Sequence, residues 1–203
     1  LFFREQALSA TPLDGLLSGL FGTKSPGTQP FPCPGAAFID ADGSYGRVSR
    51  VNDSGRWTAW MTGGGFGLPP NFAHSHSDLL APVIYLDGRP MLTEAGVFRY
   101  NVASEERMRD VLSQGHSGIR YDLQEQSLWR DTFAWGGKPI SAQLRLLPGG
   151  LAGLVLFPDG SRIRRAVTIG ADRVSIDDEF IPARGEAMLL EFNFIVLGQV
   201  VTR

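Results

Sequence analysis

The chain has little of several features that would assign a function directly. It has one cysteine, Cys33, among 203 residues, which excludes an internal disulfide and a zinc site built from several thiolates. Nineteen Lys and Arg residues balance 21 Asp and Glu residues, for a net charge of −2. This balance provides no basic surface for nucleic acid and no polybasic membrane anchor, so we expect neither partner.

Long apolar runs are also absent. The longest, at 187–190 and 194–197, are far shorter than the roughly 20 residues of a membrane-spanning helix, so we expect no membrane span. The chain begins with Leu1 and contains no recognisable signal peptide. We expect it to be a processed form or a part of a longer protein.

What the sequence does contain, from residue 36 onward, is a series of short apolar runs separated by turn signals. Asp87-Gly88 and Asp159-Gly160 are dipeptides typical of tight hairpins, and strands joined by such turns are antiparallel. The pattern predicts an all-β fold, an antiparallel two-sheet β-sandwich. The predicted strands are 46–51, 56–62, 83–86, 90–93, 128–135, 140–147, 151–157, 161–169, 173–181 and 187–201.

Two segments have a helical pattern. Leucines at helical spacing predict a short N-terminal helix within residues 1–21, and a proline-rich connector follows it. The second helix is predicted at 104–112, where Ser104 is a suitable N-cap. We therefore divide the chain into a helical and proline-rich leader, 1–30, and a β-sandwich domain, 31–203.

Chemistry is concentrated around the three histidines. His74, His76 and Asp78 alternate along a five-residue segment, and in a strand this spacing would put all three on one face. Imidazole and carboxylate are the usual zinc ligands where thiolates are lacking. The competing interpretation is a solvated strand with two chance histidines. A glycine- and proline-rich stretch, 63–71, leads into the segment and is predicted to be a loop, neither strand nor helix.

The residues from His74 to Asn101, HSHSDLLAPVIYLDGRPMLTEAGVFRYN, resemble the hallmark segment of the heparinase II/III-like polysaccharide lyases. Downstream, SQGHSGIRYD around His116 and the WRDTFAWG stretch at 129–136 resemble the next block of that family. Two positions depart from the usual family pattern, since Glu94 replaces an aspartate and Ser117 replaces an asparagine.

The resemblance implies the β-sandwich half of a lyase that cleaves an acidic, uronic-acid-containing polysaccharide by β-elimination. It implies that His76, Glu94 and His116 bind a Zn²⁺ ion, that His74 is catalytic and that Asp78 supports the site. It also implies that a helical N-terminal domain supplies the tyrosine base and a residue that neutralises the uronate carboxylate. The chain alone is therefore expected to be inactive, and the family implies a periplasmic or secreted bacterial protein.

A register argument leads to one structural expectation. If the Asp87-Gly88 hairpin were regular, Glu94 would pair with Ala81, on the face opposite His76. Because prolines interrupt both strands, we expect a bulge or strand break near residues 79–83 that restores a common face.

Other interpretations remain open at this stage. Glu94 could be an ordinary surface carboxylate, and His116 a lone polar residue after a helix. A cupin-like metal barrel also uses His-x-His, but its glutamate follows within a few residues, whereas Glu94 is 18 positions after His76. A non-catalytic carbohydrate-binding or interaction module would use the four tryptophans as stacking surfaces.

Overall fold

The structure is a computed structural model. It describes residues 37–65, 67, 70–97, 100, 105–121, 125–136, 141–183, 190–192 and 194–196. Every described residue belongs to the second of the two units into which the chain divides, 35–203. The helix predicted within 1–21, the proline-rich connector and Cys33 lie outside the described residues.

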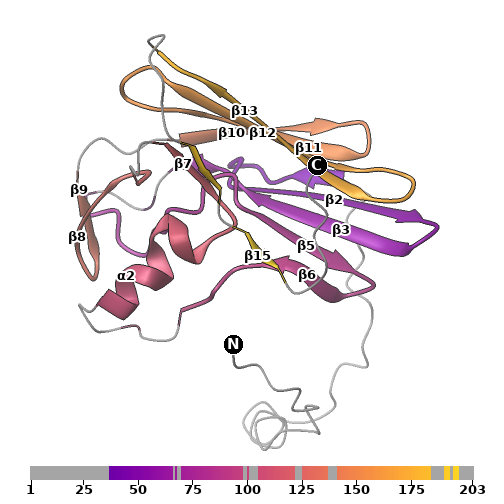
Figure 1. Cartoon of the computed structure of the whole chain (residues 1–203). Helices are drawn as coiled ribbons and strands as arrows, with labels where there is room; N and C mark the ends of the chain where they lie inside the picture. The colour runs from indigo at the N-terminus through magenta and orange to yellow at the C-terminus, as the bar shows by residue number, and fades with distance from the viewer. Residues whose placement is uncertain are drawn as a thin grey trace, which may run out of the picture. The chain divides into compact units, whose positions relative to one another are not determined.

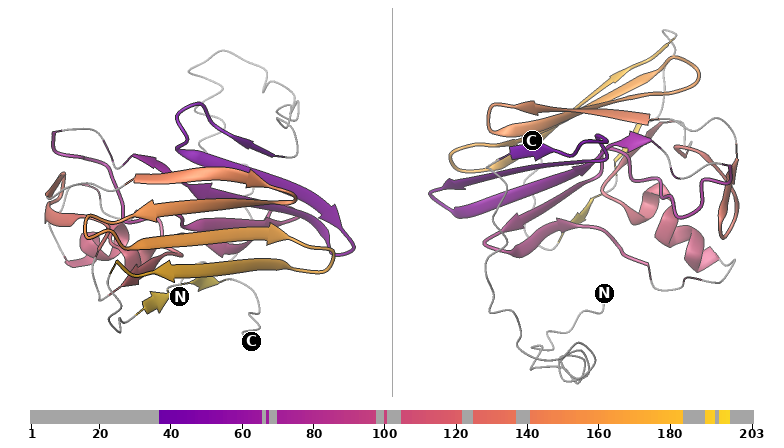
Figure 2. Two further views of the ribbon diagram at one scale, coloured as in Figure 1. Left: turned by 90° about the horizontal axis from the view of Figure 1, so that it is seen from above. Right: turned by 180° about the vertical axis from the view of Figure 1, so that it is seen from behind.

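The second unit is built from two stacked antiparallel sheets, which Figures 1 and 2 show from three sides. The first sheet has the order β1-β2-β3-β5-β6-β15 and the second has the order β13-β12-β11-β10-β4. The strands of the first are β1 (Ala37–Ile39), β2 (Tyr45–Asn52), β3 (Gly55–Thr62), β5 (Pro82–Leu86), β6 (Arg89–Thr93) and β15 (Ile195–Val196). Those of the second are β4 (Gly64–Gly65), β10 (Ser141–Leu147), β11 (Gly150–Leu156), β12 (Arg162–Ile169) and β13 (Val174–Ile181).

Alternation along the strands creates the core between the sheets. In β12 every second residue is buried, so one face of the strand points to the first sheet and the other to solvent. The side chains that meet between the sheets are mostly small or β-branched, as sandwich packing requires. They include Val48, Ala59, Met61, Ile84, Leu92, Ala142, Leu151, Val155, Ile163, Val167 and Ile169.

Short elements gather at one end of the two sheets (Figure 1). They are helix α2 (Glu105–Val111), the 3-10 turn η1 (Ser113–Gly115), the hairpin β8 (Leu128–Asp131) with β9 (Ala134–Gly136), and the pair β7 (Ile119–Tyr121) with β14 (Leu190–Phe192). The segment that carries His74 and His76 is bonded to two of them, since the Ser77 amide donates to the Val111 carbonyl of α2 and Trp135 of β9 donates to the Ser75 carbonyl.

The predicted all-β sandwich is confirmed, and most predicted strands match to within one or two residues. Three predictions need correction. The strand expected at 128–135 is a hairpin that turns at 132–133, and the 63–71 stretch includes β4. The described residues of the 187–201 stretch form two short strands that belong to different sheets. Two glycines form β4 because Gly64 and Gly65 pair with the first residues of β10. Among the described residues no helix is long and apolar enough to cross a membrane.

Candidate functional site

The segment 70–81, which carries His74 and His76, is a series of turns and not a strand. His74 and Leu80 have positive φ values, 65° and 62°, which lie outside the conformation of a regular strand. The expectation that strand alternation orients His74, His76 and Asp78 is therefore wrong. Their common environment is created by the folding of the loop.

The expected irregularity near 79–83 is confirmed. A turn, in which the Ala81 amide donates to the Asp78 carbonyl, precedes β5, which begins only at Pro82. The β5–β6 hairpin also has a bulge, since Ile84 pairs with Leu92 while Tyr85 pairs with Pro90. The bulge lies just beyond the predicted range.

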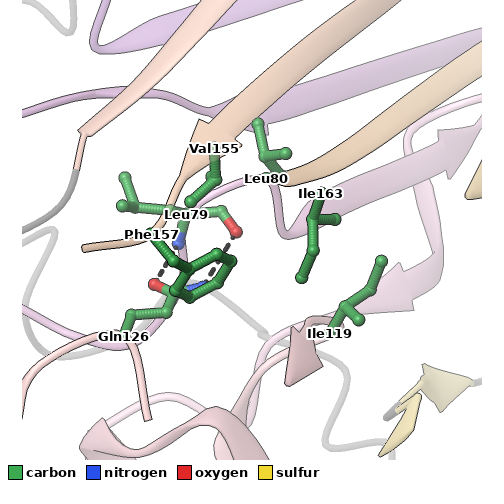
Figure 3. A pocket seen from close by; sticks show the side chains of 7 residues that line it. All are labelled: Leu79, Leu80, Ile119, Gln126, Val155, Phe157 and Ile163. Atoms are coloured by element: carbon green, nitrogen blue, oxygen red, sulfur yellow. Dashed lines mark hydrogen bonds between the residues drawn. The ribbon is translucent and has the colours of Figure 1, made fainter. Parts of the chain in front are cut away.

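Several hydrogen bonds fix the histidine loop to the elements at this end of the sandwich. Trp135 donates its backbone amide to the Asn71 carbonyl at 2.9 Å and its indole Nε1 to the Ser75 carbonyl at 3.2 Å. Gln126 holds both polar groups of the Leu79 backbone, accepting from its amide at 2.9 Å and donating to its carbonyl at 3.1 Å (Figure 3). Because buried amide hydrogen bonds are costly to break, the loop has a defined shape.

The loop brings His76 against His116, which in turn contacts Glu94, the third predicted zinc ligand. The rings of His76 and His116 lie 5.1 Å apart, and His116 Nδ1 is in hydrogen-bond contact with Glu94 Oε2. His116 follows η1 and is 3% exposed, and Glu94 follows β6. The Ala95 amide donates to the Gly115 carbonyl at 3.0 Å, so backbone contact joins the last two segments.

The pKa values of His76, Asp78 and His116 are shifted in different directions by their surroundings. Burial, followed by the charges of His116 and Arg107, lowers the pKa of His76 to about 4, so His76 is neutral at pH 7 and its nitrogen lone pair is available. Burial and the charge of Glu94 raise the pKa of Asp78 to about 6. Burial lowers the pKa of His116, but the Glu94 hydrogen bond and charge outweigh it and raise that pKa overall.

The cluster fits a zinc ion in its chemistry. Within the described ranges, no three His, Cys, Asp or Glu side chains are arranged around a common point as metal ligands. However, His116 Nε2 and Glu94 Oε1 are buried without a hydrogen-bond partner among the described residues. Such orphaned atoms cost free energy unless a bound ion or water satisfies them. Two imidazoles and a carboxylate are a donor set that zinc accepts.

His74 lies in a separate aromatic cluster next to these residues. Its Nδ1 is 2.8 Å from the Tyr100 hydroxyl, and the two rings stack at 5.8 Å. Phe133 lies 5.7 Å from His74 and 5.4 Å from Tyr100, and the Arg107 guanidinium lies over the Tyr100 ring at 5.7 Å. The sequence reasoning missed Tyr100. Its only signal was its place near the end of the block that carries the family resemblance.

A polar cleft of about 220 Å³ lies beside both clusters. His74, His76 and Asp78 line it together with Gly63, Gly65 and Gly67. Hydroxyl-bearing residues complete the wall, namely Ser44, Tyr45, Thr62 and Ser75. A cleft with this lining can hydrogen-bond a strongly hydroxylated ligand. Three of the five predicted site residues, His74, His76 and Asp78, therefore line one cleft. The other two are connected to it through His76, which contacts His116, and His116 contacts Glu94.

Substitution of Gly115 by alanine is expected to destabilise the protein. A Cβ at Gly115 would lie 2.4 Å from the Arg109 carbonyl oxygen, a backbone atom that cannot rotate away. Such overpacking lowers the free energy of unfolding by about 1–3 kcal/mol. The measurement is urea denaturation, with a chelator present so that bound metal does not contribute to stability. Gly65→Ala is the matched control because no heavy atom lies within 4 Å of its Cβ position. Equal stability of the two variants would contradict the packing argument.

The fold and the site together define an antiparallel β-sandwich domain with a histidine-rich polar cleft at one end. Residues 38–202 match the family described as heparinase II/III-like, C-terminal, and the chain belongs to this family. This confirms the resemblance found in the sequence. No curated protein matches the chain. Family membership replaces the cupin-like interpretation.

Proposed function

We propose that the chain is the β-sandwich domain of a polysaccharide lyase that cleaves uronic-acid-containing polysaccharide by β-elimination. One observation carries the proposal. His74 lies at the polar cleft with its Nδ1 bound to Tyr100, next to the cluster of His76, Glu94 and His116. Membership of the heparinase II/III-like family supports a polysaccharide substrate and a partner N-terminal domain.

The reaction needs groups of the kind found here. A base removes the proton on C5 of the uronate, the C4–O bond breaks, a C4–C5 double bond forms, and the leaving oxygen gains a proton. Charge that develops on the uronate carboxylate must be neutralised as the C5 proton leaves. Because Tyr100 holds Nδ1 of His74, Nε2 is the nitrogen that would meet the substrate, as a donor or as an acceptor depending on the tautomer.

Zn²⁺ is the cofactor that we propose for this domain, held by His76, Glu94 and His116. When bound, it would supply a fixed positive charge that organises the ligand segments around the cleft. His76 is two residues from His74, so a fixed His76 restricts where the His74 imidazole can lie. Asp78 would support the site from the cleft wall, where it lines the same surface as both histidines.

The remaining catalytic groups would come from a helical N-terminal domain. These are a tyrosine base and a side chain that neutralises the uronate carboxylate, and with them the cleft would be complete. Without them the 203-residue chain is expected to be inactive. We further propose that the whole protein is periplasmic or secreted in a bacterium, where acidic polysaccharides are accessible.

The proposed function is tested with the full-length protein that contains this chain joined to its helical domain. Uronate-containing polysaccharides are expected to yield products with the ultraviolet absorbance of a C4–C5 double bond, and a neutral glucan should yield none. New reducing ends without that absorbance would indicate hydrolysis and overturn the proposal. Binding without cleavage would favour a carbohydrate-binding module.

The positions of the four tryptophans argue against a carbohydrate-binding module that stacks sugars on aromatic rings. Trp135 is buried in the core, and Trp57 and Trp129 are partly buried against it. Trp60 packs edge-on against Phe38 at 5.7 Å. Since sugar stacking requires an open aromatic face, we rank this alternative below the lyase.

A further inference from the structure

Arg165 occupies a position where the strand pattern calls for an apolar residue. It lies on the inward face of β12 together with Ile163, Val167 and Ile169, and its exposed fraction is 0%. A charged group in such a place is costly unless it is paired and hydrogen-bonded. The burial of Arg165 is offset by an ion pair and by hydrogen bonds to backbone carbonyls.

The guanidinium makes two distinct sets of hydrogen bonds and also lies over the Phe194 ring at 5.7 Å. Nε and Nη2 donate to Asp178 Oδ1 and Oδ2 at 2.7 and 2.9 Å, a bidentate pair to the residue directly opposite on β13. Nη1 donates to the Leu80 carbonyl at 3.2 Å and to the Ser117 carbonyl at 2.6 Å. Asp178 neutralises the charge of the guanidinium and fixes its orientation. Nη1 is thereby directed to the backbone carbonyls of Leu80 and Ser117.

The two carbonyls belong to the segments that carry the histidine ligands. Leu80 is four residues after His76, and Ser117 directly follows His116. The Ser117 hydroxyl donates to the Thr93 carbonyl at 3.0 Å, and Thr93 precedes Glu94. A single nitrogen of Arg165 thus connects the His76 loop to the His116 turn, and Ser117 extends this connection to the Glu94 strand.

We propose that Arg165 is a positioning residue that sets the spacing between the segments of His76, Glu94 and His116. It acts from the second sheet and touches neither substrate nor metal. Arginine is required because its planar fork can bind Asp178 and still direct a third nitrogen to two carbonyls, which a lysine ammonium cannot do. The zinc part of this inference rests on the proposed function, and the spacing part does not.

The test compares Arg165→Met with Arg164→Met in the 203-residue chain. Arg164 is the matched control because it is exposed on the outer face and only pairs with Glu179 at 3.3 Å. In metal-free protein, Arg165→Met is expected to accelerate amide hydrogen exchange about tenfold or more at 76–81 and 115–119. Exchange in β2 and β3 should stay unchanged. Zinc affinity should fall about 10- to 100-fold, as for other residues that orient ligands.

A second variant covers the case in which Arg165→Met does not fold. Arg165→Met combined with Asp178→Leu replaces the ion pair by an apolar pair, an exchange that proteins often tolerate. It should fold and show the same faster exchange in both segments. Unchanged exchange there, or an equal increase in β2 and β3, would overturn the positioning role. If the unsubstituted chain binds no zinc, the proposed zinc site fails while the exchange measurement still decides the role of Arg165.

Discussion

Replacing His76 with alanine is expected to abolish zinc binding by the 203-residue chain, from about one ion per chain to none. His76 is the ligand that the loop brings to His116, with 5.1 Å between the two rings, and His116 contacts Glu94. Removing it leaves two protein ligands, whereas zinc sites in proteins use three or four. The measurement is elemental analysis after zinc loading and exhaustive dialysis.

His74→Ala is the control for this experiment because His74 binds Tyr100 and belongs to the neighbouring cluster. This variant should retain its zinc. Zinc that persists in His76→Ala at the level of the unsubstituted chain would contradict the ligand assignment. Absence of zinc in the unsubstituted chain would remove the metal from the proposal, and the buried His116 Nε2 and Glu94 Oε1 atoms would then need another partner.

Loss of His74 is expected to reduce turnover of the full-length protein about 10²- to 10⁴-fold, with little change in KM. This is the range that a positioned acid or base contributes to a rate. The measurement is the initial rate of unsaturated-product formation on a uronate polysaccharide. His74→Asn is the better variant beside His74→Ala, because His74 has a φ of 65° and asparagine tolerates that conformation.

Tyr100→Phe distinguishes catalysis by His74 from positioning of His74. It removes the hydroxyl 2.8 Å from His74 Nδ1 and keeps the ring that stacks at 5.8 Å. Its effect on turnover should be smaller than that of His74→Asn, and zinc content should not change. Turnover within a few-fold of the unsubstituted protein in both His74 variants would contradict a catalytic role for His74.

The strands of the sandwich could be predicted from the sequence because they depend on local patterns. Alternation in β12 and the Asp159-Gly160 turn that precedes it follow from side-chain geometry over a few residues. The zinc ligands were predicted by resemblance and not by this alternation. The strand expected at 128–135 shows the limit, since residues of similar pattern fold back as a hairpin and place Trp135 beneath the histidine loop.

The sequence by itself determined the strand segments, the fold class, the family and the residue types available for chemistry. Only the tertiary structure decided how His74 meets Tyr100, 26 residues away, and how Arg165 meets Leu80, 85 residues away. The expectation that His74 and His76 share one face of a strand was wrong, because a turn-rich loop places them. Local patterns reflect steric preferences of neighbouring residues, whereas these contacts exist only after two sheets have stacked and a turn-rich loop has packed against their end.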